Sequence, residues 1–180
     1  TAAVEERLPG ASQLRLLRAD QGAGAGYARN VGVAATSARW LAFCDADDLW
    51  TADKLASQLP LIESAPEVGL VYARCAKIDE RGRLLSVDTS LQMHRGRVTR
   101  QLVQSNFVPG ATTLLRRSFL DTVGVFDEAM RMGIDWDLWL RLSRACAFDY
   151  VDEPKYLYRM WSGQMSNNWR GRYESNFYIL

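Results

Sequence analysis

The feature that most constrains this chain is an apolar run that ends abruptly in acid. Trp40-Leu41-Ala42-Phe43-Cys44 is continuous and apolar, which is typical of a strand buried on both faces of a parallel sheet. Asp45-Ala46-Asp47-Asp48 follows it directly. Ligands of open α/β sheets collect at the carboxyl ends of the strands. The run and its acidic end therefore predict an α/β fold with a ligand-binding crevice beside residues 45–48.

The rest of the chain alternates between strand-like and helix-like patterns. Strands are predicted over residues 13–19, 68–78, 83–87, 112–115 and 148–159, the second and third joined as a hairpin. Helices are predicted over residues 23–36, 99–105, 118–123 and 135–146, and after Thr51 with Leu55, Leu59 and Ile62 facing inward. The tail from Trp161 is expected to have weak structure. Without an internal repeat or a linker, residues 1–180 are interpreted as one domain.

Composition excludes several classes of protein. The 180 residues are 48% hydrophobic and 24% charged, as in a globular domain, and no apolar run approaches the roughly 20 residues that cross a bilayer. With 22 basic and 21 acidic residues the net charge is +1, so we expect no nucleic-acid partner. Three widely spaced cysteines and the single His94 argue against a disulfide framework, a zinc site or a multi-histidine metal site.

The acidic triplet is a candidate cation site. Three carboxylates within four residues repel one another, and all-oxygen ligands favour Mg²⁺ or Mn²⁺ over zinc. Asp45 and Asp47 would present their oxygens on one side of an extended segment. The alternative is a polar turn that caps the next helix through Asp48 or Thr51.

Two other segments carry polar groups near predicted helix starts. Glycines precede Arg29 and Asn30, where free backbone N–H groups favour an anion, although a solvated arginine and a capping amide would look the same. Asp135 and Asp137 open an amphipathic helix, either as a cap and a dipole partner or with a carboxylate that faces the crevice and accepts a proton. Trp136 is interpreted as a core residue more readily than as a ligand platform.

In their order and spacing these segments resemble a family-two glycosyltransferase with the GT-A fold. The resemblance runs from Leu14 to about Ser166. It rests on Ala28-Arg29-Asn30-x-Gly32, Phe43-Cys44-Asp45-Ala46-Asp47-Asp48-x-Trp50, Gly124-x-Phe126-Asp127-Glu128, Asp135-Trp136-Asp137-Leu138-Trp139-Leu140-Arg141-Leu142 and Tyr156-Leu157-Tyr158-Arg159. It implies a Rossmann-like mixed sheet flanked by helices.

The resemblance also implies roles for individual residues. Asp45 and Asp47 match the D-x-D motif, whose carboxylates hold Mn²⁺ or Mg²⁺ on the diphosphate of a nucleotide-sugar donor. Arg29 matches a position near the nucleotide and diphosphate, and Asn30 is placed with it in the donor site. Asp135 matches the Asp of the E-D motif, the general base that takes the proton of an acceptor hydroxyl. A single base with in-line attack implies inversion at the anomeric carbon.

Other residues take lesser roles in the same resemblance. Asp48 is a helper of the metal-binding pair, Asp137 is structural, and Trp136 is a candidate for stacking on a sugar. The partners implied are a nucleotide-diphosphate sugar donor and a glycan or other hydroxyl acceptor. A cytoplasmic location is implied, at the inner face of the membrane if segments outside residues 1–180 attach there.

The chain departs from the family pattern at three places. Ile134 replaces the Glu of the E-D motif. The first two strands of the family, with their nucleotide contacts, do not precede Leu14, so we expect a partial catalytic domain that lacks its amino-terminal strands. Trp161 stands where many relatives carry a His that approaches the metal, and indole cannot ligate a cation. Residues 159–167, from Arg159 onward, are therefore expected to form a lid of unknown chemistry.

Two other functions stay open on the residues alone. A non-catalytic binding or assembly domain on the same scaffold would account for the missing strands and for Trp161. A phosphohydrolase of the haloacid-dehalogenase type also carries D-x-D after an apolar strand, but a Thr or Val usually follows two places after its second Asp, where this chain has Leu49.

Overall fold

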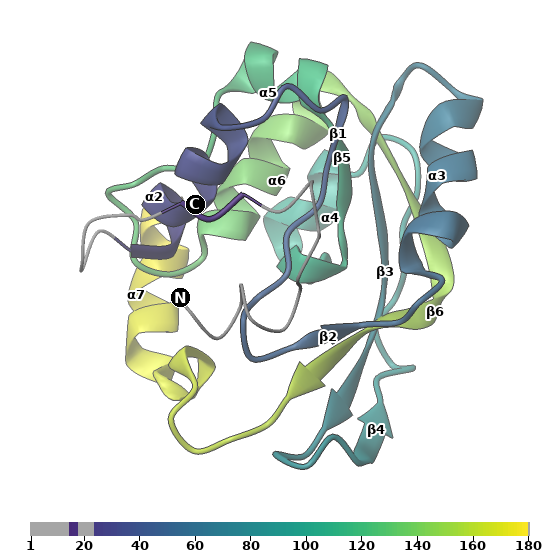
Figure 1. The fold of residues 1–180 in the computed structure, drawn as a ribbon. Helices are drawn as coiled ribbons and strands as arrows, with labels where there is room; N and C mark the ends of the chain where they lie inside the picture. Colours follow the sequence, from purple (N-terminus) through teal and green to yellow (C-terminus); the bar gives the residue numbers. More distant parts are fainter. Residues whose placement is uncertain (1–14, 18–23, 180) are drawn as a thin grey trace.

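A six-stranded mixed sheet forms the centre of the molecule in this computed structural model, which describes residues 15–17 and 24–179 (Figure 1). The spatial order is β1 (Trp40–Leu41), β5 (Leu114–Arg116), β3 (Val68–Ile78), β6 (Ala147–Arg159) and β2 (Leu49–Trp50), with β4 (Leu84–Val87) paired to β3. The long strands β3 and β6 run parallel, and the remaining pairs are antiparallel. The predicted mixed sheet and the hairpin are confirmed.

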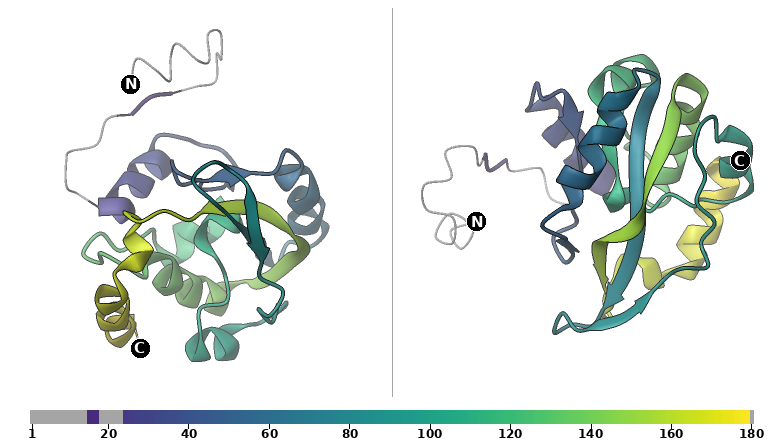
Figure 2. Two further views of the ribbon diagram at one scale, coloured as in Figure 1. Left: turned by 90° about the horizontal axis from the view of Figure 1, so that it is seen from below. Right: turned by 90° about the vertical axis from the view of Figure 1, so that its right-hand side faces the viewer.

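Helices cover both faces of this sheet (Figure 2). They are α2 (Gly24–Ala34), α3 (Lys54–Ser64), α4 (Thr99–Gln104), α5 (Arg117–Val123), α6 (Ile134–Ala145) and α7 (Trp169–Ile179), with 3₁₀ turns η1 (Gly110–Thr112) and η2 (Met165–Asn167). Helix α3 lies on one face of the sheet, and α4, α5 and α6 lie on the other. No helix in the described part of the chain is long and apolar enough to cross a bilayer.

The core is built around β3, which is buried on both faces. Leu70 and Tyr72 belong to the large apolar cluster that includes Trp139 of α6, whereas Val71 packs with Ile62 of α3 in a second cluster. Successive side chains of a strand point to opposite faces, so one continuous apolar run supplies both clusters. This arrangement fixes α6, and with it the start of that helix, against the sheet.

The prediction of a long, buried parallel strand over residues 40–44 was wrong. Strand β1 comprises Trp40 and Leu41 alone and pairs antiparallel with β5. The chain then leaves the sheet, and the Phe43 ring packs edge-on against Phe126 with 5.1 Å between the ring centroids. Residues 42–44 therefore do not extend the strand, and they lead the chain to the acidic turn.

The inner face of α3 also differs from the prediction. Lys54, Gln58 and Ile62 are buried, whereas Leu55 is 40% exposed. The Gln58 amide donates to the carbonyl oxygens of Val71 and Thr112, so it satisfies backbone that a leucine would leave unpaired. The Lys54 ammonium is held by the Gln58 side chain at 2.8 Å, and burial lowers its pKa to about 8.

Two further predictions concern the ends of the chain. The tail from Trp161 was expected to have weak structure, but it folds into η2 and the 11-residue helix α7, which carries no amphipathic pattern in its sequence. The strand predicted over residues 13–19 lies mostly outside the described residues, and residues 15–17 have no regular structure.

Candidate functional site

The acidic residues 45–48 form a tight turn between β1 and β2. The backbone N–H of Asp48 donates to the carbonyl oxygen of Asp45 at 3.2 Å, so the segment is folded rather than extended. Asp45, Asp47 and Asp48 all line one cleft, but Asp48 is only 6% exposed, whereas Asp45 is half-buried and Asp47 is exposed. Burial therefore distinguishes Asp48 from the other two carboxylates of the turn.

Asp45 is paired with Arg29 of α2. The guanidinium Nη2 lies 2.7 Å from Asp45 Oδ1, and the same guanidinium lies over the Phe126 ring, 5.5 Å from its centroid. The Asp45 side chain is 44% exposed, so solvent screens this pair and its contribution to stability is at most about 1 kcal/mol. The pair matters for the site because it places the positive charge of Arg29 beside the acidic turn.

Asp47 receives two hydrogen bonds from the segment after β6. The Trp161 indole N–H donates to Asp47 Oδ2 at 2.9 Å, and Arg159 Nε donates to the Asp47 carbonyl oxygen at 2.7 Å. Arg159 Nη1 also donates to the carbonyl oxygens of Asp79 and Glu80. Arg159 thus joins the acidic turn to the β3–β4 turn, and its guanidinium is used by the fold.

Asp48 is anchored to β6. Its Oδ1 accepts from the backbone N–H of Arg159 at 2.6 Å, and its Oδ2 accepts from the Tyr156 hydroxyl. Burial raises the pKa of this carboxyl, and these two hydrogen bonds oppose the rise. Both oxygens are engaged by the fold, which gives Asp48 a structural role, and a helper role at a metal stays a prediction.

Asp135 lies in the first turn of α6, at the wall of the cleft. Its Oδ2 accepts a long hydrogen bond of 3.4 Å from the Asn106 amide, and its Oδ1 accepts from the Trp136 backbone N–H at 2.9 Å. A Cβ added to Gly110 would lie 3.2 Å from Oδ2, so Gly110 leaves the space that the carboxylate occupies. Burial raises the pKa of Asp135, and the charge of Arg29 partly offsets the rise.

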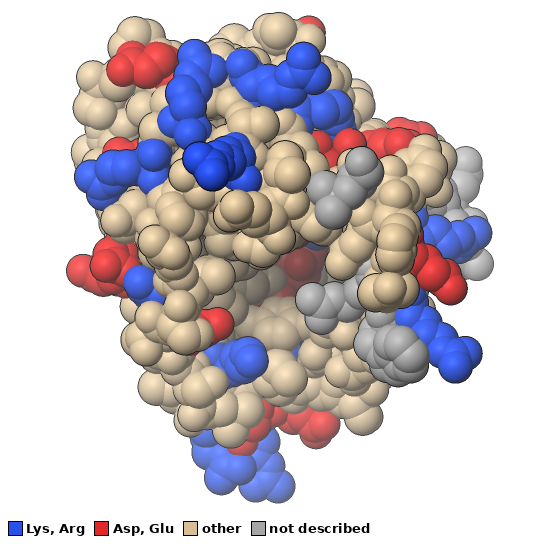
Figure 3. Space-filling view, turned by 180° about the vertical axis from the view of Figure 1, so that it is seen from behind, with Lys and Arg blue, Asp and Glu red and all other residues tan. Residues whose placement is uncertain are grey.

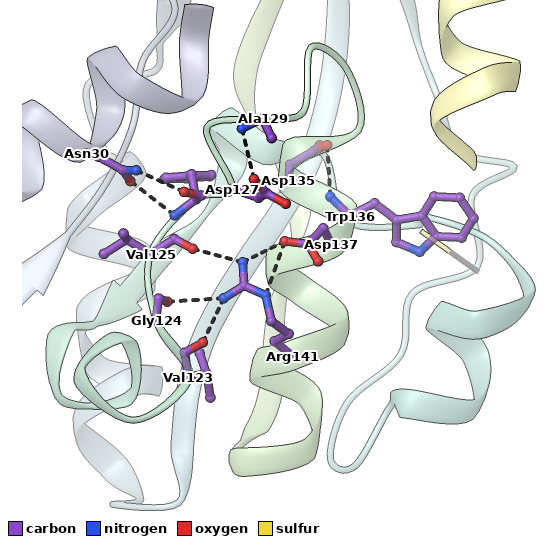
Figure 4. A network of polar contacts seen from close by, with 11 residues as sticks. Asn30, Val123, Gly124, Val125, Asp127, Ala129, Asp135, Trp136, Asp137 and Arg141 are labelled. Atoms are coloured by element: carbon purple, nitrogen blue, oxygen red, sulfur yellow. Dashed lines mark hydrogen bonds and ion pairs between the residues drawn. The ribbon is translucent and has the colours of Figure 1, made fainter. Parts of the chain in front are cut away.

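Asp137, two residues after Asp135 on α6, turns to Arg141 (Figure 4). Asp137 pairs with Arg141 at 2.6 Å, and Arg141 donates to the carbonyl oxygens of Val123, Gly124 and Val125. The structural role predicted for Asp137 is confirmed by this network.

Trp136 belongs to the core. It is 6% exposed, and its indole N–H donates to the Leu102 carbonyl oxygen at 2.8 Å, so the ring fixes α6 against α4. Trp136 also lines the cleft, and a stacking contact with a sugar stays a prediction.

Asn30 is used to hold a loop. Its amide donates to the Phe126 carbonyl oxygen at 2.9 Å and to Glu128 Oε1 at 2.8 Å, and its Oδ1 accepts from the Phe126 backbone N–H at 3.0 Å. These contacts join Asn30 of α2 to the loop after α5 (Figure 4) and so keep Phe126 beside the Arg29 guanidinium. A direct contact of Asn30 with a donor stays a prediction.

The cleft has two connected lobes. One has a volume of about 760 Å³ and contains Asp45, Asp47 and Asp135 in its wall; the other has a volume of about 560 Å³ and extends toward β3 and β6. Arg29, Asp45 and Asp135 line both lobes. The face opposite to the view of Figure 1 is visibly hollowed, with acidic side chains inside the hollow (Figure 3). The structure thus brings together the two acidic segments, 90 residues apart, that the sequence marked separately.

Several residues of this cleft were missed by the sequence analysis. Tyr158, Gln164 and Ser166 line both lobes and form one hydrogen-bonded group, with Gln164 Nε2 donating to the other two side chains. Gly110 and Asn106 support Asp135. The sequence analysis predicted a lid over residues 159–167, and the structure shows that this segment contacts the acidic turn through Arg159 and Trp161. The hydrogen-bonded group of Tyr158, Gln164 and Ser166 had no motif signal of its own.

The donor set of the cleft is compatible with a hard cation. Among the described residues no group of three or more His, Cys, Asp and Glu side chains could enclose a metal ion. Asp45 and Asp47 alone offer two carboxylates on one turn, each with one oxygen already held by a neighbouring donor. Mg²⁺ is usually bound by one or two carboxylates together with water and substrate phosphates, so this sparse set fits a cation that arrives with a diphosphate.

Comparison with known proteins agrees with this geometry. The family model described as "Glycosyltransferase like family 2" matches residues 12–177. This chain belongs to glycosyltransferase family 2. Among curated relatives, the succinoglycan biosynthesis protein ExoO of Rhizobium meliloti (strain 1021) is 27% identical over 165 residues, covering 86% of this chain and 47% of that protein. The uncharacterized glycosyltransferase YwdF of Bacillus subtilis (strain 168) is 26% identical over 131 residues, covering 73% of this chain and 48% of that protein.

The chain thus spans about half the length of these family-2 relatives. Solved structures of S. aureus TarS share its fold. One has a TM-score of 0.69 at 18% identity and covers 89% of this chain and 29% of that chain. TarS 1-349 in complex with UDP-GlcNAc has a TM-score of 0.68 at 18% identity and covers 93% of this chain and 48% of that chain. The predicted GT-A fold is confirmed, and with it the haloacid-dehalogenase alternative is set aside.

The anchoring of Asp48 can be tested by stability. We expect Asp48→Ala to lower the free energy of unfolding by about 3 kcal/mol, because it leaves the Tyr156 hydroxyl and the Arg159 amide without their acceptor. Asp48→Asn retains one acceptor oxygen and should lose less. Chemical denaturation followed by tryptophan fluorescence measures both, with the exposed Asp121→Ala as control. Equal stabilities of Asp48→Ala and Asp121→Ala would contradict the anchoring role.

Proposed function

We propose that this domain transfers a sugar from a nucleotide-diphosphate donor to an acceptor hydroxyl with inversion at the anomeric carbon. The observation that carries the proposal is that Asp45, Asp47 and Asp135 line one cleft. Family membership supports the reaction class, and the two connected lobes offer room for two substrates that meet near Arg29 and Asp135.

Asp135 is proposed as the general base. Its half-buried carboxylate lies at the start of α6. Among the described residues Oδ2 accepts one long hydrogen bond, from Asn106, and the missing side chain of Gly110 leaves room beside it. Burial raises its pKa, which brings a carboxylate closer to the pH at which it must accept a proton. The proton leaves the acceptor hydroxyl as its oxygen attacks the anomeric carbon, and the bond to the diphosphate breaks on the opposite side. The displaced nucleoside diphosphate takes the bonding electron pair.

Asp45, Asp47 and Arg29 are proposed to hold the donor. A Mn²⁺ or Mg²⁺ ion bound by the two carboxylates would neutralise charge that develops on the leaving diphosphate. Arg29 supplies a permanent positive charge at the same place through its pair with Asp45. Asn30 acts behind Arg29 by fixing the loop that carries Phe126. This division gives each residue of the predicted donor site a physical task.

The donor and acceptor are proposed by class. The solved neighbour TarS carries UDP and UDP-GlcNAc in its structures, so a uridine diphosphate sugar is the first donor to test. The curated relative ExoO is a succinoglycan biosynthesis protein, so a glycan hydroxyl is the first acceptor to test.

The general-base assignment is tested by Asp135→Asn in the full-length protein. We expect transfer to fall at least ~100-fold while the affinity for UDP stays within about twofold, because the amide accepts no proton but keeps the shape of the side chain. Product formation and calorimetric UDP binding measure the two effects, with Asp121→Asn as the exposed control. Turnover equal to that of an active wild type would remove Asp135 from this role. Absence of turnover in the wild type itself would instead favour a non-catalytic domain.

The same variant has an expected effect on stability. A carboxyl whose pKa is raised in the folded state loses stabilising free energy as pH rises from its unfolded pKa through its folded one. Above that window the folded protein carries a buried ionised group that Asp135→Asn removes. We therefore expect the melting temperature of Asp135→Asn at neutral pH to equal or exceed that of the wild type.

The pH profile provides a separate prediction. Because Asp135 must be ionised to accept a proton and burial raises its pKa, kcat/KM should fall as the pH is lowered through a value above the ordinary Asp pKa of about 4. Tryptophan fluorescence at each pH shows whether the fold persists across this limb. A profile that stays flat down to pH about 4 in folded protein would contradict the assignment.

The cation-binding pair is tested with UDP and Mn²⁺. We expect wild-type protein to bind UDP at least ~10-fold more tightly with Mn²⁺ than without it, since the ion bridges the carboxylates and the diphosphate. Asp47→Ala should abolish this difference. Asp121→Ala should preserve it. A cation effect that survives Asp47→Ala would place the metal elsewhere.

A further inference from the structure

Trp161 contacts Asp47, one of the two candidate cation-binding residues. Its indole N–H donates to Asp47 Oδ2 at 2.9 Å, although the side chain is 41% exposed. An indole offers a single N–H donor and no acceptor, so it cannot bind a cation itself. It can, however, fix one oxygen of a carboxylate that does.

The segment that carries the Trp161 ring is folded back on itself. The backbone N–H of Trp161 donates to Gln164 Oε1 at 2.9 Å, and Gln164 is buried and bonded to Tyr158 and Ser166. The ring also lies over Gly163, where an added Cβ would come within 2.1 Å of ring atom Cζ3. The segment after β6 is thus folded into a turn that presents the indole to the acidic turn.

The two carboxylates of the acidic turn have different partners. Asp45 is paired with the guanidinium of Arg29 at 2.7 Å, which offsets its negative charge. Asp47 accepts from a neutral N–H, which leaves its charge intact. Hydrogen-bond donors that contact a metal-binding carboxylate from behind orient it, and their removal typically costs about 10–100-fold in metal affinity.

We propose that Trp161 is a positioning residue for the cation site: its N–H holds Asp47 Oδ2 so that Oδ1 is presented to the cation, and residues 160–167 are thereby coupled to occupancy of the site. This inference rests on the proposed function, because it needs Asp47 to bind a cation. It assigns to Trp161 a contribution to cation binding that does not require ligation.

The first test is cation affinity rather than activity. In full-length protein with UDP, Trp161→Phe keeps an aromatic ring but removes the N–H, and we expect Mn²⁺ to bind about 10-fold more weakly by calorimetry. Trp40→Phe, on β1 against Arg39 and Arg116, is the matched control and should leave the affinity unchanged. Unchanged affinity in Trp161→Phe would overturn the proposal. Tighter binding would overturn it too, since it would mean that the indole competes with the cation.

Gly163→Ala is an independent variant that keeps the indole. The added methyl group would collide with the ring, so the ring must leave its place and the affinity for Mn²⁺ should fall as in Trp161→Phe. Wild-type affinity in a folded Gly163→Ala protein would contradict the proposal. This variant also serves if Trp161→Phe does not fold.

The indole signal separates this inference from the proposed function. In a ¹⁵N-labelled sample the Trp161 N–H resonance is identified by its absence in Trp161→Phe. We expect it to shift in Asp47→Ala and during titration with Mg²⁺ and UDP. A resonance unmoved by Asp47→Ala would refute the hydrogen bond. A shift with Asp47→Ala but no cation binding by wild-type protein would instead overturn the cation part of the proposed function, and the positioning role with it.

Discussion

The cleft depends on the buried hydrogen bonds that tie the acidic turn to the end of β6. Asp48 accepts from the Tyr156 hydroxyl and from the Arg159 backbone N–H, and Arg159 in turn donates to the Asp47 carbonyl oxygen. Charge-assisted hydrogen bonds in a buried setting are strong, and a partner left without its acceptor there is costly. This tie fixes the turn relative to a long strand of the sheet. The positions of Asp45 and Asp47 follow from it, because they share the same four-residue turn.

A second constraint is the cost of keeping ionisable groups away from water. Burial raises the pKa of Asp135 and lowers the pKa of Lys54 to about 8. For Lys54 the cost is met by contacts within the fold, at 2.8 Å to Gln58 and 4.5 Å to the centre of the Trp50 ring. Within the described residues, Asp135 accepts hydrogen bonds from the Asn106 amide at 3.4 Å and from the Trp136 backbone N–H, and the charge of Arg29 also stabilises its ionised form. An incompletely satisfied carboxylate facing a cleft is destabilising for the fold but suited to accepting a proton.

The sequence predicted most of the helices and strands and both acidic segments, but not how the chain connects them. Alternation and apolar runs identify β3, β6 and α6 because these elements bury side chains at fixed periods. A strand was predicted over all of residues 40–44 because they are apolar. Apolar composition alone cannot show that Phe43 packs against Phe126 and does not take part in strand pairing. The buried polar face of α3 was missed for a similar reason, because Gln58 is buried for its hydrogen bonds to distant backbone. Helix α7 lacks an amphipathic pattern and gave no periodic signal.

The acidic turn shows why spacing alone could not separate the tasks of its members. An extended segment would place Asp45 and Asp47 on one side and Asp48 on the other by simple alternation. The segment is instead folded by the hydrogen bond from the Asp48 backbone N–H to the Asp45 carbonyl oxygen, and all three residues line the cleft. They differ in burial and in partners: β6 supplies two donors to the buried Asp48, while Arg29 and Trp161 approach the other two carboxylates from α2 and from the segment after β6. The three roles are therefore set by partners that lie 16 to 114 residues away in the chain. A local motif can mark such a turn, but the assignment of each carboxylate belongs to the tertiary structure.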